Sequence, residues 1–343
     1  MNVVFCRNCV LKISNSPIKE YGYVTAQLSS AFRCFSKSSS SNKMIVLIGG
    51  GTGFVGKALR QQLEAKGHST VLVSRSSGRN KVTWDEIRQN GLPECHAVVN
   101  LAGENILNPA KRWTDEFKKL VWDSRVGTTT LLAEAISNSE KPPNVFVGMS
   151  GIGYYPPSTT AEYTEESSVT DQDYLGKLCV EWEKAMDGAG SKVDGQGQEV
   201  RKVVVRTAVV LGKGGGAIQQ MQWPFYFGVG GIIGSGKQIF PWIHINDIAG
   251  IFVHAIENES VNGVLNGISP HPISNHAFTK AMGAALWRPT LFPLPGFMVR
   301  TVFGEDRAVM LLQGQRALPK KTLESGYTFK YPEIDSALKE IFS

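Results

Sequence analysis

The chain has 343 residues, 42% of them hydrophobic and 19% charged, which is typical of a globular protein with a sizeable core. Its apolar runs are too short to span a bilayer, so we expect no membrane partner. Five of the six net positive charges lie in residues 1–43, so the rest of the chain has no general electrostatic affinity for polyanions, and we expect no nucleic-acid partner.

Residues 1–43 are rich in serine and basic residues, and they lack the long apolar run of a secretory signal. This composition predicts an organellar transit peptide. The sequence Arg33-Cys34-Phe35-Ser36 resembles a site cut by the mitochondrial processing peptidase. We therefore expect a location in the mitochondrial matrix, or in the cytoplasm if the segment is not a transit peptide. The alternatives are a disordered tail and an extension upstream of a start at Met44.

The first elements of the folded part form a βαβ unit. Residues 44–48 are a continuous apolar run, as expected of a parallel strand that is buried on both faces. A glycine-rich turn over 49–56 leads into an amphipathic helix with Val55, Leu59 and Leu63 at helical spacing. Residues 70–73 predict a second buried strand.

The glycine spacing of this turn suits the binding of a dinucleotide pyrophosphate. Gly50 permits a tight turn, Gly53 lets the backbone approach a phosphate, and Gly56 lets the helix pack closely on the sheet. The start of the helix offers free N–H groups to the anion. A glycine-rich hairpin is the alternative, but no alternating strand follows it. The residues expected at the pyrophosphate are Gly50, Thr52, Gly53, Phe54, Val55 and Gly56.

The second strand ends in Ser74-Arg75, where NAD-binding proteins usually carry an acidic residue for the ribose 2′-hydroxyl. A hydroxyl and a guanidinium can instead bind a 2′-phosphate. This pair predicts NADP as the cofactor, with Ser74 and Arg75 as ligands. The alternative for Arg75 is a solvated surface side chain.

Strands and helices alternate along the following residues. This order predicts an α/β fold of the Rossmann type, a doubly wound parallel sheet with helices on both faces. Residues 188–199 are glycine-rich and polar, and we expect a surface loop there. The predicted elements are strands at 82–84, 97–100, 145–150 and 203–210, and helices at 114–137 and 171–187.

The pattern changes after residue 212, where glycines and aromatic residues cluster. We expect an NADP-binding domain over 44–212, a smaller α/β substrate lobe over 213–290 that interleaves with the Rossmann sheet, and a C-terminal module over 291–343. Beyond the N-terminal segment only Cys95 and Cys179 occur, which predicts neither a disulfide framework nor a metal site.

Several further motifs occur between residues 44 and 343. They include Asn100-Leu101-Ala102-Gly103, Arg112-Trp113, Ser124-Arg125, Val209-Val210-Leu211-Gly212, residues 240–247 (FPWIHIND), Gly326-Tyr327-x-Phe329 and Pro332-x-Ile334-x-x-Ala337-Leu338. With the glycine spacing, they resemble the extended short-chain dehydrogenase/reductases. Within these, the sequence resembles the atypical "epimerase family" branch, which is similar to NAD-dependent epimerases and dehydratases and has its own C-terminal module.

The resemblance implies further cofactor contacts. The backbone of Leu101, Ala102 and Gly103 would line the adenine ribose and pyrophosphate, and Arg125 would reach the phosphates. A surface helix arginine is the alternative for Arg125. The backbone of Val210 would touch the nicotinamide. The resemblance also implies a possible homodimer.

The chemistry of this family uses a Tyr, a Lys four residues later on the same helix face and a Ser that orients the substrate oxygen. Ser150 fits the last role, although it is equally suited to capping a loop. Lys177 matches the Lys, but Asp173 occupies the Tyr position and Tyr174 is only three residues from Lys177. Tyr174 and Lys177, three residues apart, would still share one face of the helix and could form a shifted pair. Alternatively, the Tyr–Lys pair is lost and Asp173 caps the helix. The other candidate proton donors are Tyr154, Tyr155 and Tyr163.

Two functions follow from these observations. The first is an NADP(H)-dependent oxidoreductase or epimerase-like enzyme that acts on a small polar carbonyl or alcohol. The second is a non-catalytic NADP-binding sensor or scaffold that has lost the Tyr–Lys pair. The two differ in whether a proton donor lies beside the nicotinamide.

Overall fold

The computed structural model describes residues 43–106, 111–169, 173–190, 192–193 and 197–343, and all structural statements refer to these residues. The predicted transit peptide and its cleavage site lie outside the described residues, as do parts of the predicted 188–199 loop. None of the described helices is long and apolar enough to cross a bilayer.

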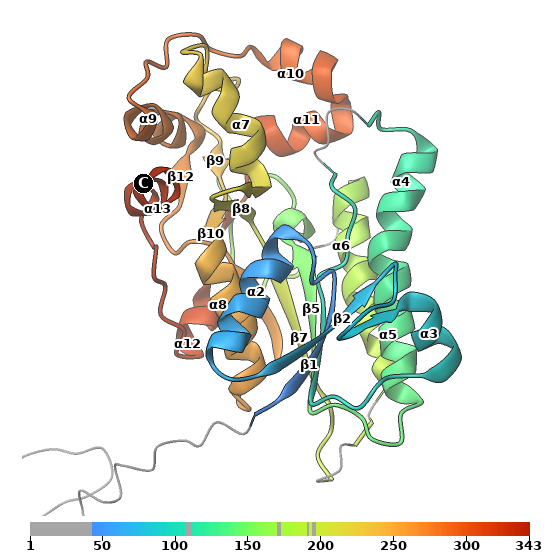
Figure 1. Ribbon diagram of the computed structural model, residues 1–343. Helices are drawn as coiled ribbons and strands as arrows, with labels where there is room; N and C mark the ends of the chain where they lie inside the picture. Colours follow the sequence, from blue (N-terminus) through green and yellow to red (C-terminus); the bar gives the residue numbers. More distant parts are fainter. Residues whose placement is uncertain (1–42, 107–110, 170–172, 191, 194–196) are drawn as a thin grey trace, which may run out of the picture. The chain divides into compact units, whose positions relative to one another are not determined.

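The central element is a parallel sheet of seven strands with the order β11-β7-β5-β4-β1-β2-β3 (Figure 1). This confirms the predicted α/β Rossmann architecture. Because every neighbouring pair is parallel, all carboxyl ends lie at one edge, and the strand order reverses between β1 and β4. The strands are β1 (Ile45–Gly49), β2 (Ser69–Ser74), β3 (Lys81–Thr83), β4 (Ala97–Asn100), β5 (Val145–Gly151), β7 (Arg201–Thr207) and β11 (Gly263–Gly267).

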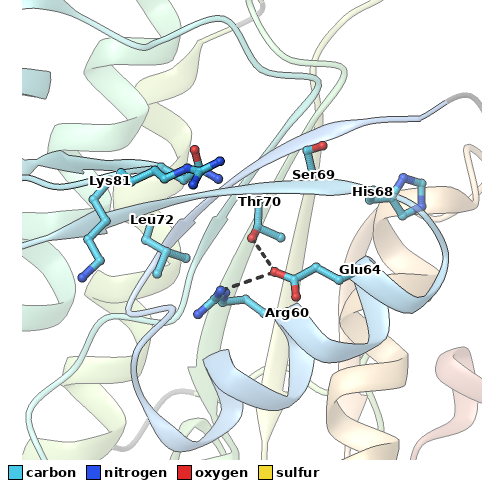
Figure 2. Close-up of a pocket in the computed structure, with 9 residues that line it drawn as sticks. Arg60, Glu64, His68, Ser69, Thr70, Leu72 and Lys81 are labelled. Carbon is cyan, nitrogen blue, oxygen red and sulfur yellow. Dashed lines mark hydrogen bonds and ion pairs between the residues drawn. The ribbon is translucent and has the colours of Figure 1, made fainter.

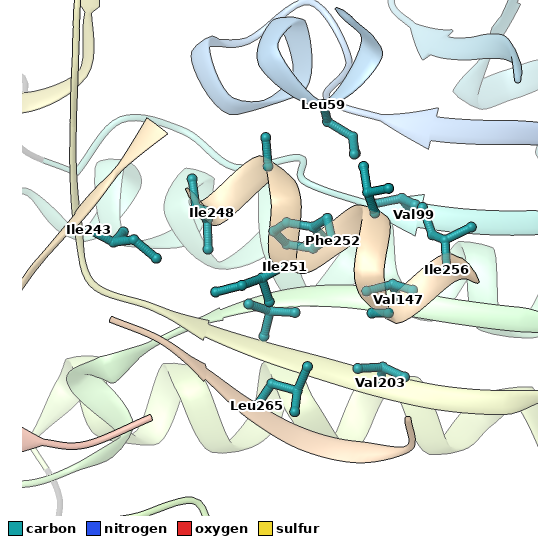
Figure 3. Packing of buried hydrophobic residues seen from close by; sticks show 14 of the residues in the cluster. Leu59, Val99, Val147, Val203, Ile243, Ile248, Ile251, Phe252, Ile256 and Leu265 are labelled. Carbon is teal, nitrogen blue, oxygen red and sulfur yellow. The ribbon is translucent and has the colours of Figure 1, made fainter. Parts of the chain in front are cut away.

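Helices cover both faces of the sheet, which explains why the central positions of most of its strands are apolar. On β1, Val46 and Ile48 pack in the cluster beneath one face, while Leu47 points into the cluster on the other. Figure 3 shows Leu59 and Phe252 packing over Val99 and Val147. The covering helices are α2 (Phe54–Ala65) and α8 (Ile245–Glu257) on the first face, with α3 (Trp84–Asn90), α5 (Thr128–Ser137) and α6 (Tyr174–Lys184) on the second.

The single strand predicted over 203–210 is two strands in the structure, and only the first belongs to the main sheet. The chain bends at Ala208, whose N–H donates to the Gly267 carbonyl oxygen at 3.0 Å. Residues beyond the bend form β8 (Val209–Gly212), which pairs with β10 (Trp242–His244) in a separate sheet. Val210 therefore lies outside the main sheet. The sequence also gave no sign of β11, which is short and contains two glycines and Asn266.

The predicted helix over 114–137 is interrupted. It consists of α4 (Asp115–Trp122), a π-helical turn (Asp123–Gly127) and α5. Such turns are rare and often occur at functional sites, because they redirect side chains relative to a regular helix. This one carries Arg125.

Most of the remaining elements form a lobe beyond the carboxyl edge of the sheet, with its own core around Trp242, Phe278 and Leu338 (Figure 1). Helix α13 from the end of the chain packs on α9 in that core. The lobe contains α7 (Gly216–Tyr226), α9 (Asn275–Leu286), α10 (Gly296–Phe303), α11 (Glu305–Leu312), α13 (Ile334–Phe342), and the strand pair β9 (Ile239–Phe240) with β12 (Ile273–Ser274). Helix α12 (Lys320–Glu324) instead packs on β11 of the main sheet, and β13 (Arg316–Ala317) pairs with β6 (Glu162–Tyr163).

Candidate cofactor site

The turn after β1 is built so that larger residues cannot replace two of its glycines. Gly50 has φ +75°, and a Cβ there would lie 2.6 Å from the Leu101 carbonyl oxygen. A Cβ on Gly56 would lie 2.4 Å from the Gly50 carbonyl oxygen. The absence of side chains at Gly50 and Gly56 therefore lets the turn lie close to the start of α2 and to the segment that follows β4.

Gly53 differs from these two positions because its surroundings are open. It precedes α2 in an extended conformation, and a Cβ there would approach only the Gly50 carbonyl oxygen, at 3.2 Å. No side chain caps α2 and its first turn contains no acidic residue. Since the first N–H groups of a helix lack intrahelical partners, those of Phe54, Val55 and Gly56 suit an anion. The residues present therefore fit a pyrophosphate, with exposed Thr52 beside it.

The Phe54 side chain contacts a second glycine run after β8. A Cβ on Gly215 or Gly216 would lie within 2.7 Å of the Phe54 ring, and one on Gly212 within 2.9 Å. Gly216 also has φ +61°, and a Cβ there would meet the Val210 carbonyl oxygen at 2.6 Å. The glycines thus let this loop close over Phe54, so only the Phe54 backbone remains for a phosphate.

Ser74 and Arg75 lie at the carboxyl end of β2. The Ser74 hydroxyl donates to the Ser76 carbonyl oxygen and accepts from the Ser76 N–H, so it shapes the turn. Arg75 is exposed and makes no ion pair or hydrogen bond within the described part of the chain. Its guanidinium is therefore available to a ligand at this edge.

A cavity of about 390 Å³ lies alongside β2 and α2 (Figure 2). Glu64 lies at its wall and accepts hydrogen bonds from Arg60 at 3.3 Å and from the Thr70 hydroxyl at 3.0 Å. None of its lining residues is among the predicted cofactor ligands. We do not include it in the cofactor site, because it faces the side of β2 rather than the carboxyl edge.

Asn100 holds the turn that follows β4. Its buried amide donates to the hydroxyls of Thr128 and Thr129, and its Oδ1 accepts from the Ala102 N–H at 3.1 Å. Leu101 N–H donates to the Gly49 carbonyl oxygen at 2.8 Å. Asn100 belongs to the Asn100-Leu101-Ala102-Gly103 motif, but the sequence alone does not indicate this role.

Arg125 lies against the same turn. Its Nη2 donates to the Glu104 carbonyl oxygen at 2.9 Å, and a Cβ on Gly103 would lie 3.1 Å from its Cζ. Its guanidinium lies 5.2 Å from the Trp182 ring centroid. The π-helical turn thus places a cation beside Leu101, Ala102 and Gly103, as the predicted phosphate contact requires; the contact itself stays a prediction.

The three predicted catalytic side chains have different surroundings. Ser150 is buried at the end of β5 and its hydroxyl donates to Glu183 at 2.8 Å. The Tyr174 hydroxyl donates to the Lys118 carbonyl oxygen of α4 at 2.9 Å, with its ring edge-on to Trp113. Lys177 is exposed on α6. As placed, Ser150 and Tyr174 would each have to break a hydrogen bond before donating to a substrate.

Asp173 is the N-cap of α6, as the alternative interpretation expected. Its Oδ1 accepts from the Gly176 N–H at 2.8 Å. A carboxylate at this position satisfies a free N–H group of the first helical turn and leaves Tyr174 as the first helical residue. The residue that replaces the family's Tyr therefore has a structural role here.

Glu183 belongs to a buried network that sequence reasoning missed. Arg206 of β7 donates to it through Nε and Nη2, both at 2.8 Å, and through Nη1 to the Tyr155 hydroxyl at 2.9 Å. Burial by itself lowers the pKa of Arg206, but hydrogen bonds and the charge of Glu183 raise it above the ordinary value. The sequence offered one indication of this network: Arg206 directly follows the apolar residues Val203–Val205, and a buried arginine needs an acidic or polar partner.

The three alternative tyrosines differ in position. Tyr155 is fully buried and its hydroxyl contacts Thr164, Asn266 and Arg206, so burial raises its pKa. Tyr163 lies on β6, stacked on Tyr155. Tyr154 is half-buried just after β5, with the Arg206 guanidinium 3.3 Å from its ring centroid. No described residue makes a hydrogen bond with the Tyr154 hydroxyl.

Two family models match the chain. The NAD dependent epimerase/dehydratase family matches residues 46–266, and a domain of unknown function (DUF1731) matches residues 294–341. The human "Epimerase family protein SDR39U1" is 52% identical over 298 residues, which cover 87% of this chain and 99% of that protein. The Bacillus subtilis "Epimerase family protein YfhF" is 32% identical, covering 88% of this chain and 98% of that protein.

Solved structures of epimerase-family proteins are also similar to this chain. A crystal structure of human SDR39U1 (isoform 2) with NADPH is 52% identical and has a TM-score of 0.83, covering 87% of this chain and 99% of that one. A UDP-N-acetylglucosamine 4-epimerase from Bacillus cereus, at 18% identity and a TM-score of 0.67 over 88% of this chain and 96% of that one, shares the fold. The chain belongs to the NAD dependent epimerase/dehydratase family, in the branch of epimerase family proteins that end in the additional C-terminal module.

Proposed function

We propose that this protein binds NADP(H) and is an oxidoreductase or epimerase-like enzyme for a small polar carbonyl or alcohol. The main observation behind the proposal is that, among the described residues, no side chain caps the start of α2 and none pairs with Arg75, which lies at the same edge of the sheet. The NADPH in the crystal structure of the similar human protein supports the choice of cofactor.

The roles of this chain's residues follow from their positions. The first-turn N–H groups of α2 would bind the pyrophosphate, and Arg125 would add a positive charge beside the turn after β4. Arg75 would pair with the 2′-phosphate. When bound, NADP(H) supplies or accepts the hydride.

We propose Tyr154 as the proton donor in place of Tyr174. Its half-buried ring lies directly after β5, four residues beyond Ser150, and its hydroxyl is not committed to another described residue. The adjacent Arg206 would stabilise negative charge that develops on the phenolic oxygen during proton transfer.

Titrations with NADPH and NADH test the cofactor proposal. Arg75→Asp removes a charge-assisted contact and adds repulsion, so NADPH affinity should fall by about 10- to 150-fold, the equivalent of roughly 1.5–3 kcal/mol. NADH affinity should change little. Arg88→Asp, an exposed arginine on α3, serves as the control and should leave both affinities unchanged. Equal losses for NADPH and NADH in Arg75→Asp would contradict a 2′-phosphate contact.

The second candidate, a non-catalytic NADP-binding sensor or scaffold, is favoured by the hydrogen bonds that occupy Ser150 and Tyr174. Incubation with NADP(H) and a panel of aldehydes, ketones and nucleotide sugars separates the two candidates, with NADPH absorbance and epimer formation both measured. An oxidoreductase should consume NADPH with at least one compound and an epimerase should form an epimer without net loss of NADPH, and in either case Tyr154→Phe should lower kcat by about 100-fold or more. Tyr174→Phe is the matched control. NADPH binding without turnover on the whole panel would favour the sensor.

A further inference from the structure

Exposed apolar side chains are concentrated on one part of the lobe. Nine of the twelve large hydrophobic side chains that are exposed in the described residues lie between positions 223 and 298. Trp287 is 89% exposed and Phe227 76%. A concentration of this kind marks an interaction surface, whereas isolated exposed hydrophobic residues are normal. We call it the apolar lobe surface: Trp223, Tyr226, Phe227, Val229, Trp287, Leu291, Phe292, Phe297 and Met298.

Side-chain and backbone contacts hold the segments of this surface together. At the end of α7, the Trp223 ring lies 6.3 Å from that of Phe227. Arg288, just after α9, donates through Nε to the Tyr226 carbonyl oxygen at 3.1 Å. Leu294 exchanges hydrogen bonds with Ile232 at 2.8 Å and Gly234 at 2.9 Å. Figure 1 shows α7 between α9 and α10 in the upper part of the lobe.

Charges beside this surface have one predominant sign. The chain contains no Asp or Glu over residues 200–246 or 260–304. Lys280 and Arg288 are exposed at α9, and Arg300 is exposed on α10. Arg300 alone has an acidic partner, Glu305, at 3.0 Å in an exposed ion pair. Two of these three flanking cations, Lys280 and Arg288, thus have no acidic partner within the described part of the chain.

We propose that the apolar lobe surface docks on an anionic phospholipid bilayer. Tryptophan and phenylalanine side chains are stable at the boundary between headgroups and acyl chains. Lysine and arginine beside them are attracted to anionic headgroups, by about 1 kcal/mol for each cation near the surface. This docking is peripheral, and it departs from the expectation of no membrane partner, which rested on the absence of a spanning segment.

A second copy of this chain fits the surface less well. A twofold interface places the same patch on both subunits. Lys280 and Arg288 of one subunit would then approach the same cations of the other. Opposed like charges disfavour such a contact, whereas an anionic bilayer complements them.

Flotation of the full chain with phospholipid vesicles tests the proposal. The vesicles are phosphatidylcholine alone, or phosphatidylcholine with phosphatidylglycerol. We expect the protein to float with the anionic vesicles only, and binding to weaken as salt is added. Trp287→Asn combined with Phe292→Gln should lower the partition coefficient by about tenfold or more. Asn suits position 287 because the backbone there is left-handed, with φ +55°.

The controls separate this surface from other sources of binding. Leu120→Gln combined with Leu323→Gln alters exposed hydrophobic residues outside the surface and should leave binding unchanged. The basic residues 1–43 are present in every variant, so differences between variants report on the lobe. Matching thermal unfolding midpoints would show that the variants are folded.

Two results would overturn the proposal. One is equal vesicle binding by the wild type and the Trp287/Phe292 variant, which would assign binding to another segment. The other is an absence of binding to anionic vesicles. If sedimentation then showed a wild-type dimer and a monomeric variant, the surface would be a subunit interface instead.

Discussion

Three glycines of one motif have different physical roles. Gly50 and Gly56 are required by the protein itself, because a Cβ at either position would overlap backbone atoms. Gly53 has an ordinary φ of −71°, and a Cβ there would meet only the Gly50 carbonyl oxygen, at 3.2 Å, so the fold restricts this position less than the other two. What Gly53 leaves free is the space in front of the first turn of α2.

This difference gives a prediction for two alanine variants. Gly53→Ala should keep nearly wild-type stability but lower NADPH affinity by about tenfold or more, because its Cβ would occupy the space for the pyrophosphate. Gly56→Ala should lower the free energy of unfolding by about 1–3 kcal/mol through overpacking. Urea unfolding and NADPH titration measure the two effects. Unchanged affinity in a folded Gly53→Ala protein would remove Gly53 from the cofactor site.

At the scale of elements, α2 and α6 begin in different ways. Helix α2 starts without a side-chain cap and leaves its N–H groups to a ligand, whereas α6 starts with Asp173 bound to the Gly176 N–H. The π-helical turn between α4 and α5 supplies Arg125 to the turn after β4. The start of a helix or a local change in its winding thus decides which groups reach the carboxyl edge of the sheet.

Two substitutions distinguish a helix cap from a catalytic base at Asp173. Asn caps as well as Asp, so Asp173→Asn should preserve both stability and any NADPH turnover. Asp173→Ala should lower the free energy of unfolding by about 0.5–2 kcal/mol. Urea denaturation and a turnover assay measure these outcomes. Loss of turnover in a stable Asp173→Asn protein would show that the carboxylate takes part in the reaction.

At the scale of the whole molecule, buried polar contacts connect the Rossmann sheet to the C-terminal residues. Asn266 of β11 accepts from the Tyr155 hydroxyl, and its Nδ2 donates to the Leu318 carbonyl oxygen at 2.9 Å. Glu165 accepts from Asn266 N–H and from the backbone of residues 321 and 322. His244, at the start of α8, lies 3.0 Å from Glu340 near the chain end. The C-terminal segment is therefore held to the sheet by polar groups as well as by its apolar core.

The pH dependence of the free energy of unfolding tests the burial of His244 beside Glu340. Burial lowers the pKa of His244 below its ordinary value of 6.5, although Glu340 opposes the shift. Because the unfolded chain then binds the proton more readily, the free energy of unfolding should fall as pH drops below about 6.5, by at most about 1.4 kcal/mol per pH unit. In His244→Gln this decline should be smaller, though not absent, since burial also lowers the pKa of His254. Identical pH profiles from urea unfolding would contradict the prediction.

The sequence alone determined the class of fold, the glycine turn and the Ser74-Arg75 strand end, because these depend on local patterns. Apolar runs of strand length, a turn that only glycine can form and a cation after a strand are all readable within a few residues. The tertiary structure decided the bend at Ala208, the π-helical turn at Arg125 and the partners of Ser150 and Tyr174. Those features depend on contacts with Gly267, Glu104, Glu183 and Lys118, which lie 20 or more residues away in the chain. Local propensity contains no information about such partners, so the catalytic geometry could only be read once the chain was folded.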